Sequence, residues 1–211
     1  MMNLFDMQRF ATQKGTSGND TLVVKKSGNV VYGYAGNDSI TNVFDKVTIS
    51  TGVGNDYVWN RGSNVQIFGE AGKDFIINSG DSVKVAGGAD NDSIFSYGNY
   101  ATVTSDAGND YIESQGDYSN VAGGAGKDTI IASGYRVTVS GGKGNDFVSF
   151  DRGRYNYSTF QYASGDGDDT IYGFNSDSYF HITKDSYSTV ASGKNLILKI
   201  GSGSVTFFGR D

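Results

Sequence analysis

The feature that most constrains the fold of this chain is a set of aspartates spaced at a constant interval. Eight of them recur at one 18-residue interval with no insertion: Asp20, Asp38, Asp56, Asp74, Asp92, Asp110, Asp128 and Asp146. The residue two places after each aspartate is aliphatic in every copy, from Leu22 to Val148. A repeat this short cannot bury an apolar face alone, so each copy is expected to stack on its neighbours.

A second apolar position recurs eleven residues after each aspartate. It is occupied by Val31, Ile49, Ile67, Val85, Val103, Val121, Val139 and Tyr157. Strand residues alternate between the two faces of a sheet, so two apolar positions in each repeat predict two strands per turn. We therefore expect an all-β fold, a right-handed parallel β-roll or β-solenoid whose 18-residue turns stack about 4.8 Å apart.

The residues around each aspartate form a recurring glycine-rich phrase. Residues 141–148 read GGKGNDFV, residues 123–130 read GGAGKDTI and residues 33–40 read GYAGNDSI. Glycine allows positive φ, the aspartate supplies a carboxylate, and the following aliphatic residue begins a strand. The phrase resembles the nonapeptide of RTX proteins, which folds as a calcium-binding parallel β-roll. The resemblance implies several calcium ions held between stacked loops.

The chemistry of calcium explains why the spacing matters. Calcium takes six to eight oxygen ligands, which two loops stacked one turn apart supply and one loop does not. A single aspartate of this kind is more simply a turn former, but eight at constant spacing favour calcium. The candidate ligands are Asp20, Asp38, Asp56, Asp74, Asp92, Asp110, Asp128, Asp146 and Asp169 with Gly36, Gly54, Gly72, Gly108, Gly126 and Gly144.

Only one half of each turn carries the aspartate loop, and the other half carries a plainer turn. In the RTX proteins that the chain resembles, both halves commonly carry the motif. We therefore expect one row of calcium along one edge of the roll. Individual loops also differ, because Asp90 replaces the glycine two places before Asp92, and Lys73 and Lys127 replace the usual asparagine. Asp tolerates positive φ, and the lysines are expected to point away from the ion.

The two ends depart from the repeat, which predicts three regions. Residues 1–14 form an N-terminal segment, whose apolar spacing suits a short helix acting as a cap or as an assembly arm. Residues 15–171 form the calcium-binding roll, although the last loop, at Asp169, follows Asp146 after a longer interval than the others. Residues 172–211 form a C-terminal β cap. It resembles the ends of RTX-like proteins, where an uncleaved segment directs type I secretion.

Composition excludes several classes of function. The 211-residue chain has a net charge of −6, which argues against a nucleic-acid partner. It contains no cysteine, so thiolate metal sites and disulfides are excluded, and no apolar run approaches the ~20 residues of a membrane span. With the family resemblance, these features predict a secreted or cell-surface protein of a bacterium.

Outward positions on the first strand of each turn define a candidate interaction surface. Residues one and three places after each aspartate are predicted to face solvent. They include Tyr57, Trp59, Phe75, Ile77, Phe95, Tyr111, Ile131 and Phe147, which form an apolar, aromatic strip. Such a patch usually marks an interaction surface. The alternative is that a terminal segment folds back and covers the strip.

These features predict a structural protein that assembles with copies of itself into a filament or layer, attached to a cell surface or free. The alternative is an adhesin or ligand-binding module that uses the aromatic strip. Ice binding is a weaker alternative. Ice-binding proteins of the RTX type present rows of Asn and Thr from their calcium loops. This chain keeps much of the Asn row, but the Thr row is replaced by residues such as Ala35, Val53 and Ala71. Enzymatic activity is not expected, since His181 is the one histidine and no catalytic motif is present.

Overall fold

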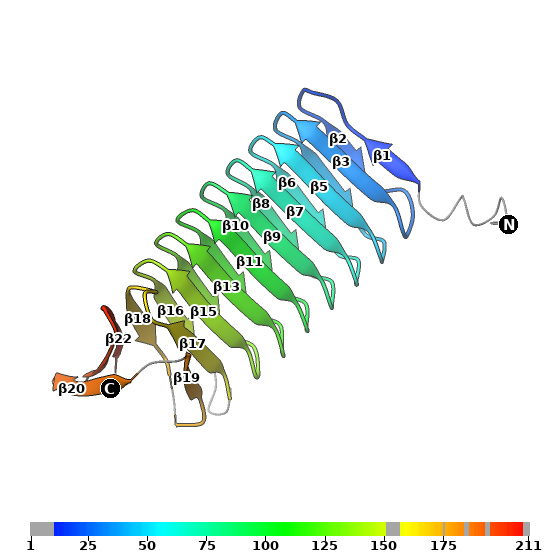
Figure 1. The fold of residues 1–211 in the computed structure, drawn as a ribbon. Coiled ribbons are helices and arrows are strands. Elements are labelled where there is room, and N and C mark those ends of the chain that lie inside the picture. Colours follow the sequence, from blue (N-terminus) through cyan, green and yellow to red (C-terminus); the bar gives the residue numbers. More distant parts are fainter. Residues whose placement is uncertain (1–10, 151–156, 175, 184–185, 193–194, 209–211) are drawn as a thin grey trace, which may run out of the picture.

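The computed structural model describes residues 11–150, 157–174, 176–183, 186–192 and 195–208, which form a long stack of strands (Figure 1). The described residues contain strands and turns but no helix. Residues 1–10 of the predicted N-terminal helical segment, residues 1–14, lie outside the described residues. Its last three residues, Thr12–Lys14, form strand β1, so the helix prediction was wrong there.

The strands of successive turns fall into two long sheets that face each other across a narrow core. The 10-stranded sheet runs in the order β1(Thr12–Lys14), β3(Val30–Ala35), β5(Thr48–Val53), β7(Gln66–Ala71), β9(Lys84–Ala89), β11(Thr102–Ala107), β13(Asn120–Ala125), β15(Thr138–Lys143), β17(Thr159–Ala163) and β19(Tyr179–Thr183). All of its neighbouring strands pair in parallel. The chain is thus an all-β parallel solenoid, as predicted.

The 12-stranded sheet contains the shorter strand of each turn and a C-terminal addition. By the length of their repeat strands, we call it the shorter sheet and the 10-stranded sheet the longer sheet. Its order is β2(Thr21–Val23), β4(Ser39–Asn42), β6(Tyr57–Asn60), β8(Phe75–Asn78), β10(Ser93–Ser96), β12(Tyr111–Ser114), β14(Thr129–Ala132), β16(Phe147–Phe150), β18(Asp168–Tyr172), β22(Gly203–Phe207), β21(Asn195–Ile200) and β20(Tyr187–Ser192). Strands β22, β21 and β20 pair antiparallel, which ends the parallel roll.

The register between turns is one full repeat, and it aligns the predicted apolar residues in two internal rows. In the shorter sheet Ile94 pairs with Ile76 on one side and Ile112 on the other. In the longer sheet Val103 pairs with Val85 and Val121. Each of these side chains is buried, and a third row that includes Val47, Val65, Val83 and Val137 joins them in the core. Its burial is the main apolar stabilisation of the roll.

The extra residues before the last loop are split between the two sheets. Phe160, and not the predicted Tyr157, continues the inner row of the longer sheet, because Val139 pairs with Phe160. Tyr157 instead lies in a turn with φ of 46°. In the shorter sheet Val148 pairs with Ile171. The prediction for Tyr157 was wrong because the constant interval was extended past the point where extra residues enter the chain.

A buried asparagine ladder, which the sequence analysis missed, lines one edge of the core. Asn42 donates from Nδ2 to Oδ1 of Asn60 at 2.7 Å, and Asn60 donates to Oδ1 of Asn78 at 2.8 Å. The Asn60 amide also bonds the backbone of Gly62 in the plain turn. The ladder therefore satisfies buried polar groups and fixes the shape of these turns.

The ladder gives a testable prediction. Replacing Asn60 with alanine removes its hydrogen bonds to Asn42, to Asn78 and to the backbone of Gly62, and each buried group left unsatisfied costs about 1–3 kcal/mol. We expect a clear loss in the free energy of unfolding, measured by denaturant titration at saturating calcium. The control is Asn120→Ala, because Asn120 is exposed on β13. Equal stability of the two variants would contradict this account of the ladder.

Candidate calcium-binding edge

The aspartate loops all lie on one edge of the roll, between a strand of the longer sheet and the next strand of the shorter sheet. Residues two and four places before each aspartate adopt positive φ in the repeats from Asp38 to Asp146. Glycine fills most of these positions, for example Gly36 and Gly72. Asp90 stands at one of the glycine positions with φ of 77°, a conformation that Asp tolerates better than most residues.

The aspartates form a column along this edge. Oδ1 of each accepts a hydrogen bond from the backbone N–H of the aspartate one turn earlier: Asp38 from Asp20 at 2.8 Å, and Asp92 from Asp74 at 2.8 Å. The same contact joins Asp146 to Asp169 across the longer interval, at 3.0 Å. The side chains from Asp38 onward are at most 3% exposed. The constant spacing thus places one buried carboxylate directly beside the next.

The second oxygen of each buried carboxylate has no hydrogen-bond partner. This holds for Oδ2 of Asp38, Asp56, Asp74, Asp92, Asp110, Asp128, Asp146 and Asp169. Asp20, at the end of the row, differs because its Oδ2 accepts bonds from the N–H and hydroxyl of Thr16. Buried charged oxygens without partners are costly, so a row of eight indicates that this edge is built to hold cations.

A glycine five places before the aspartate shapes the space that Oδ2 faces. A Cβ at Gly33 would clash with Oδ2 of Asp38 and with the carbonyl oxygen of Thr51 in the next turn. A Cβ at Gly69 would likewise clash with Asp74 and the carbonyl of Gly87. Neither glycine has positive φ, so glycine is required here for space alone. The sequence analysis did not single out this position.

Burial raises the pKa of several carboxyls in the column, among them those of Asp74, Asp92 and Asp128, from the ordinary value of 3.8. Desolvation is the largest cause, and neighbouring aspartates add to it, while the backbone hydrogen bond opposes it. The pKa of Asp74 rises to about 8, and those of Asp92 and Asp128 rise to about 7. A bound cation reverses this balance, because it favours the ionised form.

The donor set on this edge fits calcium. Oxygen atoms alone face the space between loops, namely carboxylate Oδ2 and backbone carbonyls. No cluster of three or more His, Cys, Asp or Glu side chains occurs among the described residues, so carbonyls must complete any coordination shell. Hard oxygen ligands in this number and type suit Ca²⁺ better than a transition metal.

An asparagine row runs beside the aspartates and links the turns. Oδ1 of Asn37 accepts from the backbone N–H of Asn55, and Oδ1 of Asn55 accepts from the N–H of Lys73. The residue at this position therefore contributes its N–H to the previous turn whatever its side chain. Lys73 and Lys127 are exposed, in line with the expectation that they point away from the loop interior.

The predicted aromatic strip is present on the outer face of the shorter sheet. Four rings follow one another along it: Tyr57 and Phe75 stack at 5.8 Å, Phe75 and Phe95 lie 5.2 Å apart, and Phe95 and Tyr111 lie 5.6 Å apart. We call these four residues the aromatic ladder. Trp59 is half-buried beneath the guanidinium of Arg61, and Ile77, Ile131 and Phe147 are half-buried.

The C-terminal strand β22 extends the outer face beyond one end of the predicted strip, because it pairs with β18. The ring of Phe208 stacks on Tyr172 at 4.4 Å, and Tyr172 lies 5.4 Å from Phe147. No described residue of either terminus packs on the aromatic ladder in the same way, and Tyr57 and Phe75 remain 39% and 40% exposed. The ladder is therefore the larger open part of this surface.

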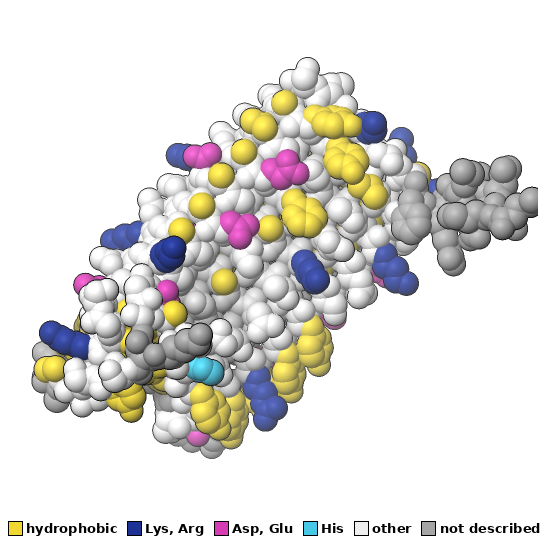
Figure 2. All heavy atoms as spheres, viewed as in Figure 1, with side chains coloured by type: hydrophobic (Ala, Val, Ile, Leu, Met, Phe, Trp, Pro, Cys, Tyr) yellow, Lys and Arg dark blue, Asp and Glu magenta, His cyan; other side chains and the backbone are white. Residues whose placement is uncertain are grey.

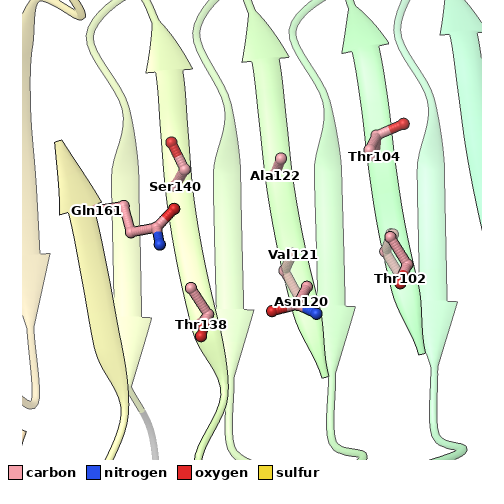
Figure 3. A pocket seen from close by; sticks show the side chains of 9 residues that line it. Thr102, Thr104, Asn120, Val121, Ala122, Thr138, Ser140 and Gln161 are labelled. Atoms are coloured by element: carbon pink, nitrogen blue, oxygen red, sulfur yellow. The ribbon is translucent and has the colours of Figure 1, made fainter. Parts of the chain in front are cut away.

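The opposite face, formed by the longer sheet, is mixed: Figure 2 shows hydrophobic side chains among polar ones, and Tyr32, Tyr34 and Phe68 of this sheet are exposed. Its clearest hollow lies where Ala122 stands between the longer side chains of Thr104 and Ser140 (Figure 3). The other outward residues that line it are Thr102, Asn120, Thr138 and Gln161. None of the lining residues is ionisable, so the hollow offers no general acid or base.

The solenoid and its column of buried carboxylates define a calcium-binding β-roll. Four copies of the RTX calcium-binding nonapeptide repeat match the chain, over residues 14–42, 122–155 and 163–177. The recognised repeats are thus RTX repeats, and calcium is their cofactor. The chain contains further loops of the same design between residues 42 and 122, since their aspartates keep the same register and contacts.

The fold is also similar to solved structures. A hyperactive, Ca²⁺-dependent, β-helical antifreeze protein from an Antarctic bacterium is 28% identical, with a TM-score of 0.69. The similarity covers 82% of this chain but 57% of that structure, so this chain spans little more than half its length. The extracellular lipase LipA from Serratia marcescens matches at 16% identity with a TM-score of 0.36. A comparison with curated proteins found no match.

The raised pKa values predict how pH acts on the calcium-free protein. Because the folded-state pKa values of Asp146, Asp128 and Asp74 are about 6, 7 and 8, protonation stabilises the metal-free fold. This contribution is full below the ordinary pKa of 3.8 and is lost as the pH rises through 6 to 8. After calcium is removed by dialysis, we expect the denaturant concentration at the midpoint of unfolding to be lower at pH 8 than at pH 5.

The control for this prediction is the same titration at saturating calcium. Calcium competes with protons for the carboxylates, so stability with calcium should hold or rise over the same range. A calcium-free midpoint that rises with pH would contradict the assignment of these raised pKa values to the folded state.

Proposed function

We propose that the chain is a secreted, calcium-stabilised β-roll with a structural role, and that its aspartate loops hold one row of calcium ions. The proposed ligands are Asp20, Asp38, Asp56, Asp74, Asp92, Asp110, Asp128, Asp146 and Asp169, with carbonyls of the adjoining loops. The row of buried, unpartnered Oδ2 atoms supports this assignment. The loops lie along one edge, so the chain holds a single row and the plain edge holds none.

Bound calcium would supply positive charge between carboxylates and bridge successive turns. The chain's own residues prepare the place for it. Oδ1 of each aspartate is held by the N–H of the previous turn, which aims Oδ2 into the space beside it. In six of the loops a glycine five places earlier keeps that space free of a Cβ. The loops are therefore preorganised, and metal binding is coupled to folding.

The aromatic ladder is the observation that carries the proposed self-association. Its four adjacent rings form a contiguous apolar surface on the outer face of the shorter sheet, and such surfaces usually mark contacts with other molecules. A second copy presents the same flat ladder at the same repeat. Two ladders can therefore align along their length, with rings meeting rings at matched spacing.

The ends of the roll offer a second route to assembly. Strands β1 and β2 begin the two sheets, and β19 and β20 end them, so each has one side without a strand partner among the described residues. Unpaired strand edges readily accept strands of another molecule. A head-to-tail contact between unlike ends does not close on itself, and it would extend the solenoid into a filament.

An adhesin or ligand-binding module is the second candidate function. It would use the same aromatic ladder for a foreign partner. The similarity to an antifreeze protein favours ice as one ligand to test, and the outward asparagine row agrees with it. The position two places before this row is nevertheless Ala35, Val53 or Ala71 in successive loops, where no hydroxyl is available. We therefore place ice binding below self-association.

A non-enzymatic role agrees with the described surface. His181 lies exposed in β19 beside Gln161, away from the aspartate column. The hollow between Thr104 and Ser140 has no ionisable residue. The repeated aspartates are explained by metal binding, which leaves no pair with the distinct environments that acid–base catalysis needs.

Secretion is proposed from the family and from the dependence on calcium. RTX repeat proteins are typically bacterial and extracellular, where calcium is plentiful. Among the described residues, no helix is long and apolar enough to cross a membrane. We propose export through the C-terminal region, residues 172–211, by the type I route, followed by folding on calcium outside the cell. Attachment to the cell surface would follow from contacts of the ladder or the ends.

The proposed self-association predicts a specific effect of mutation. Phe75→Ser together with Phe95→Ser removes the two central rings, so the particle mass at millimolar calcium should shift toward the monomer. Analytical ultracentrifugation and electron microscopy would measure the shift. The matched control is Gln66→Ser with Lys84→Ser, which changes two exposed residues of the opposite sheet.

Monomers of the unchanged protein under these conditions would contradict self-association. Assembly that survives the ladder variant while a foreign ligand is lost would favour the adhesin instead.

A further inference from the structure

The loops are not all open at the position five places before the aspartate. Gly15, Gly33, Gly69, Gly87, Gly123 and Gly141 occupy it in six loops, but Thr51 and Ser105 occupy it in the loops of Asp56 and Asp110. Both hydroxyl side chains are fully buried. Each occupies the position at which, in a loop with glycine, an added Cβ would clash with that loop's aspartate and with a carbonyl of the next turn.

Each hydroxyl donates a hydrogen bond to a backbone carbonyl of the next turn. Oγ1 of Thr51 donates to the carbonyl of Gly69 at 2.6 Å, and Oγ of Ser105 donates to the carbonyl of Gly123 at 2.6 Å. In the loops with glycine no side chain reaches the equivalent carbonyl from this position, as at Gly69, which has no Cβ to contact the carbonyl of Gly87. The side chain therefore fills the gap and engages one of the oxygens that a cation would need.

A second difference falls on the same two gaps. The loop that follows Thr51 has Lys73 beside Asp74, and the loop that follows Ser105 has Lys127 beside Asp128. Asparagine or, in the last loop, aspartate stands there in the other loops. Each lysine side chain is exposed, yet its positive charge makes a further cation at this gap less favourable than the asparagine of the other loops does.

The two exceptions, Thr51 and Ser105, lie three turns apart along the roll. Other residues share this longer period: residues 38–40 and 92–94 both read DSI, residues 55–57 and 109–111 both read NDY, and residues 72–74 and 126–128 both read GKD. In the last loop Ser164 stands five places before Asp169, three loops after Ser105. The chain is therefore a repeat of three-turn blocks built from the shorter repeat.

We propose that Thr51 and Ser105 close two of the gaps between aspartate loops, so that the calcium row is interrupted after every third turn. The Asp56–Asp74 and Asp110–Asp128 gaps hold a hydroxyl bridge in place of calcium. The remaining gaps form separate short groups of sites. This inference rests on the proposal that the aspartate loops hold calcium, and it removes Oδ2 of Asp56 and of Asp110 from the ligands proposed above.

The test is a count of bound calcium in the full chain by native mass spectrometry at saturating calcium. Thr51→Gly restores the consensus residue and opens one gap, so we expect one more bound ion than in the unchanged protein. Ser105→Gly should add one ion, and the double variant should add two. The matched controls are Ser50→Gly and Thr104→Gly, which remove the preceding hydroxyl on the outer face and should leave the count unchanged.

A second measurement does not depend on the variants. In crystals of the unchanged protein grown with calcium, anomalous scattering should give peaks between Asp74 and Asp92 but none in the two filled gaps. Peaks there, or an unchanged count in the folded glycine variants, would overturn the inference while leaving calcium binding intact. An unchanged protein that binds no calcium at millimolar concentration would instead refute the proposed function, and this inference with it.

Discussion

The fold depends on how carboxylates are held when they are stacked one strand spacing apart. From Asp38 to Asp169, each aspartate is buried, shares Oδ1 with the N–H of the previous turn and leaves Oδ2 without a partner. Burial and mutual repulsion make the ionised column unfavourable, as the pKa of about 8 at Asp74 shows. Protons relieve the cost at low pH, and calcium relieves it at the pH of most extracellular fluids.

The sequence was sufficient for the fold because one interval decides most of it. A constant short period with two aliphatic positions leaves few options besides a two-sheet solenoid, and pairs such as Ile94 with Ile112 confirm the register. The same interval located the aspartates that the structure brings into one column. Where the interval changes, the prediction failed: Phe160, and not Tyr157, continues the core. Which sheet takes up extra residues depends on packing that the period does not encode.

Other features required the three-dimensional structure because their meaning depends on partners in neighbouring turns. Asn60 reads as an ordinary polar strand residue until its bonds to Asn42 and Asn78 are seen. Thr51 reads as a tolerated substitution of glycine until its hydroxyl is found bonded to Gly69. A period observed along the chain shows which positions are equivalent, and differences between equivalent positions become informative once the space around them is known.

The central claim is that the column of aspartates makes the fold depend on calcium, and far-ultraviolet circular dichroism tests it most directly. The measurement compares the protein at neutral pH with calcium, after removal of calcium by EGTA and after calcium is restored. The account predicts a β spectrum with calcium, its loss without calcium, and its recovery on addition, because the ionised column has no other source of compensating charge. An unchanged β spectrum in EGTA would contradict it.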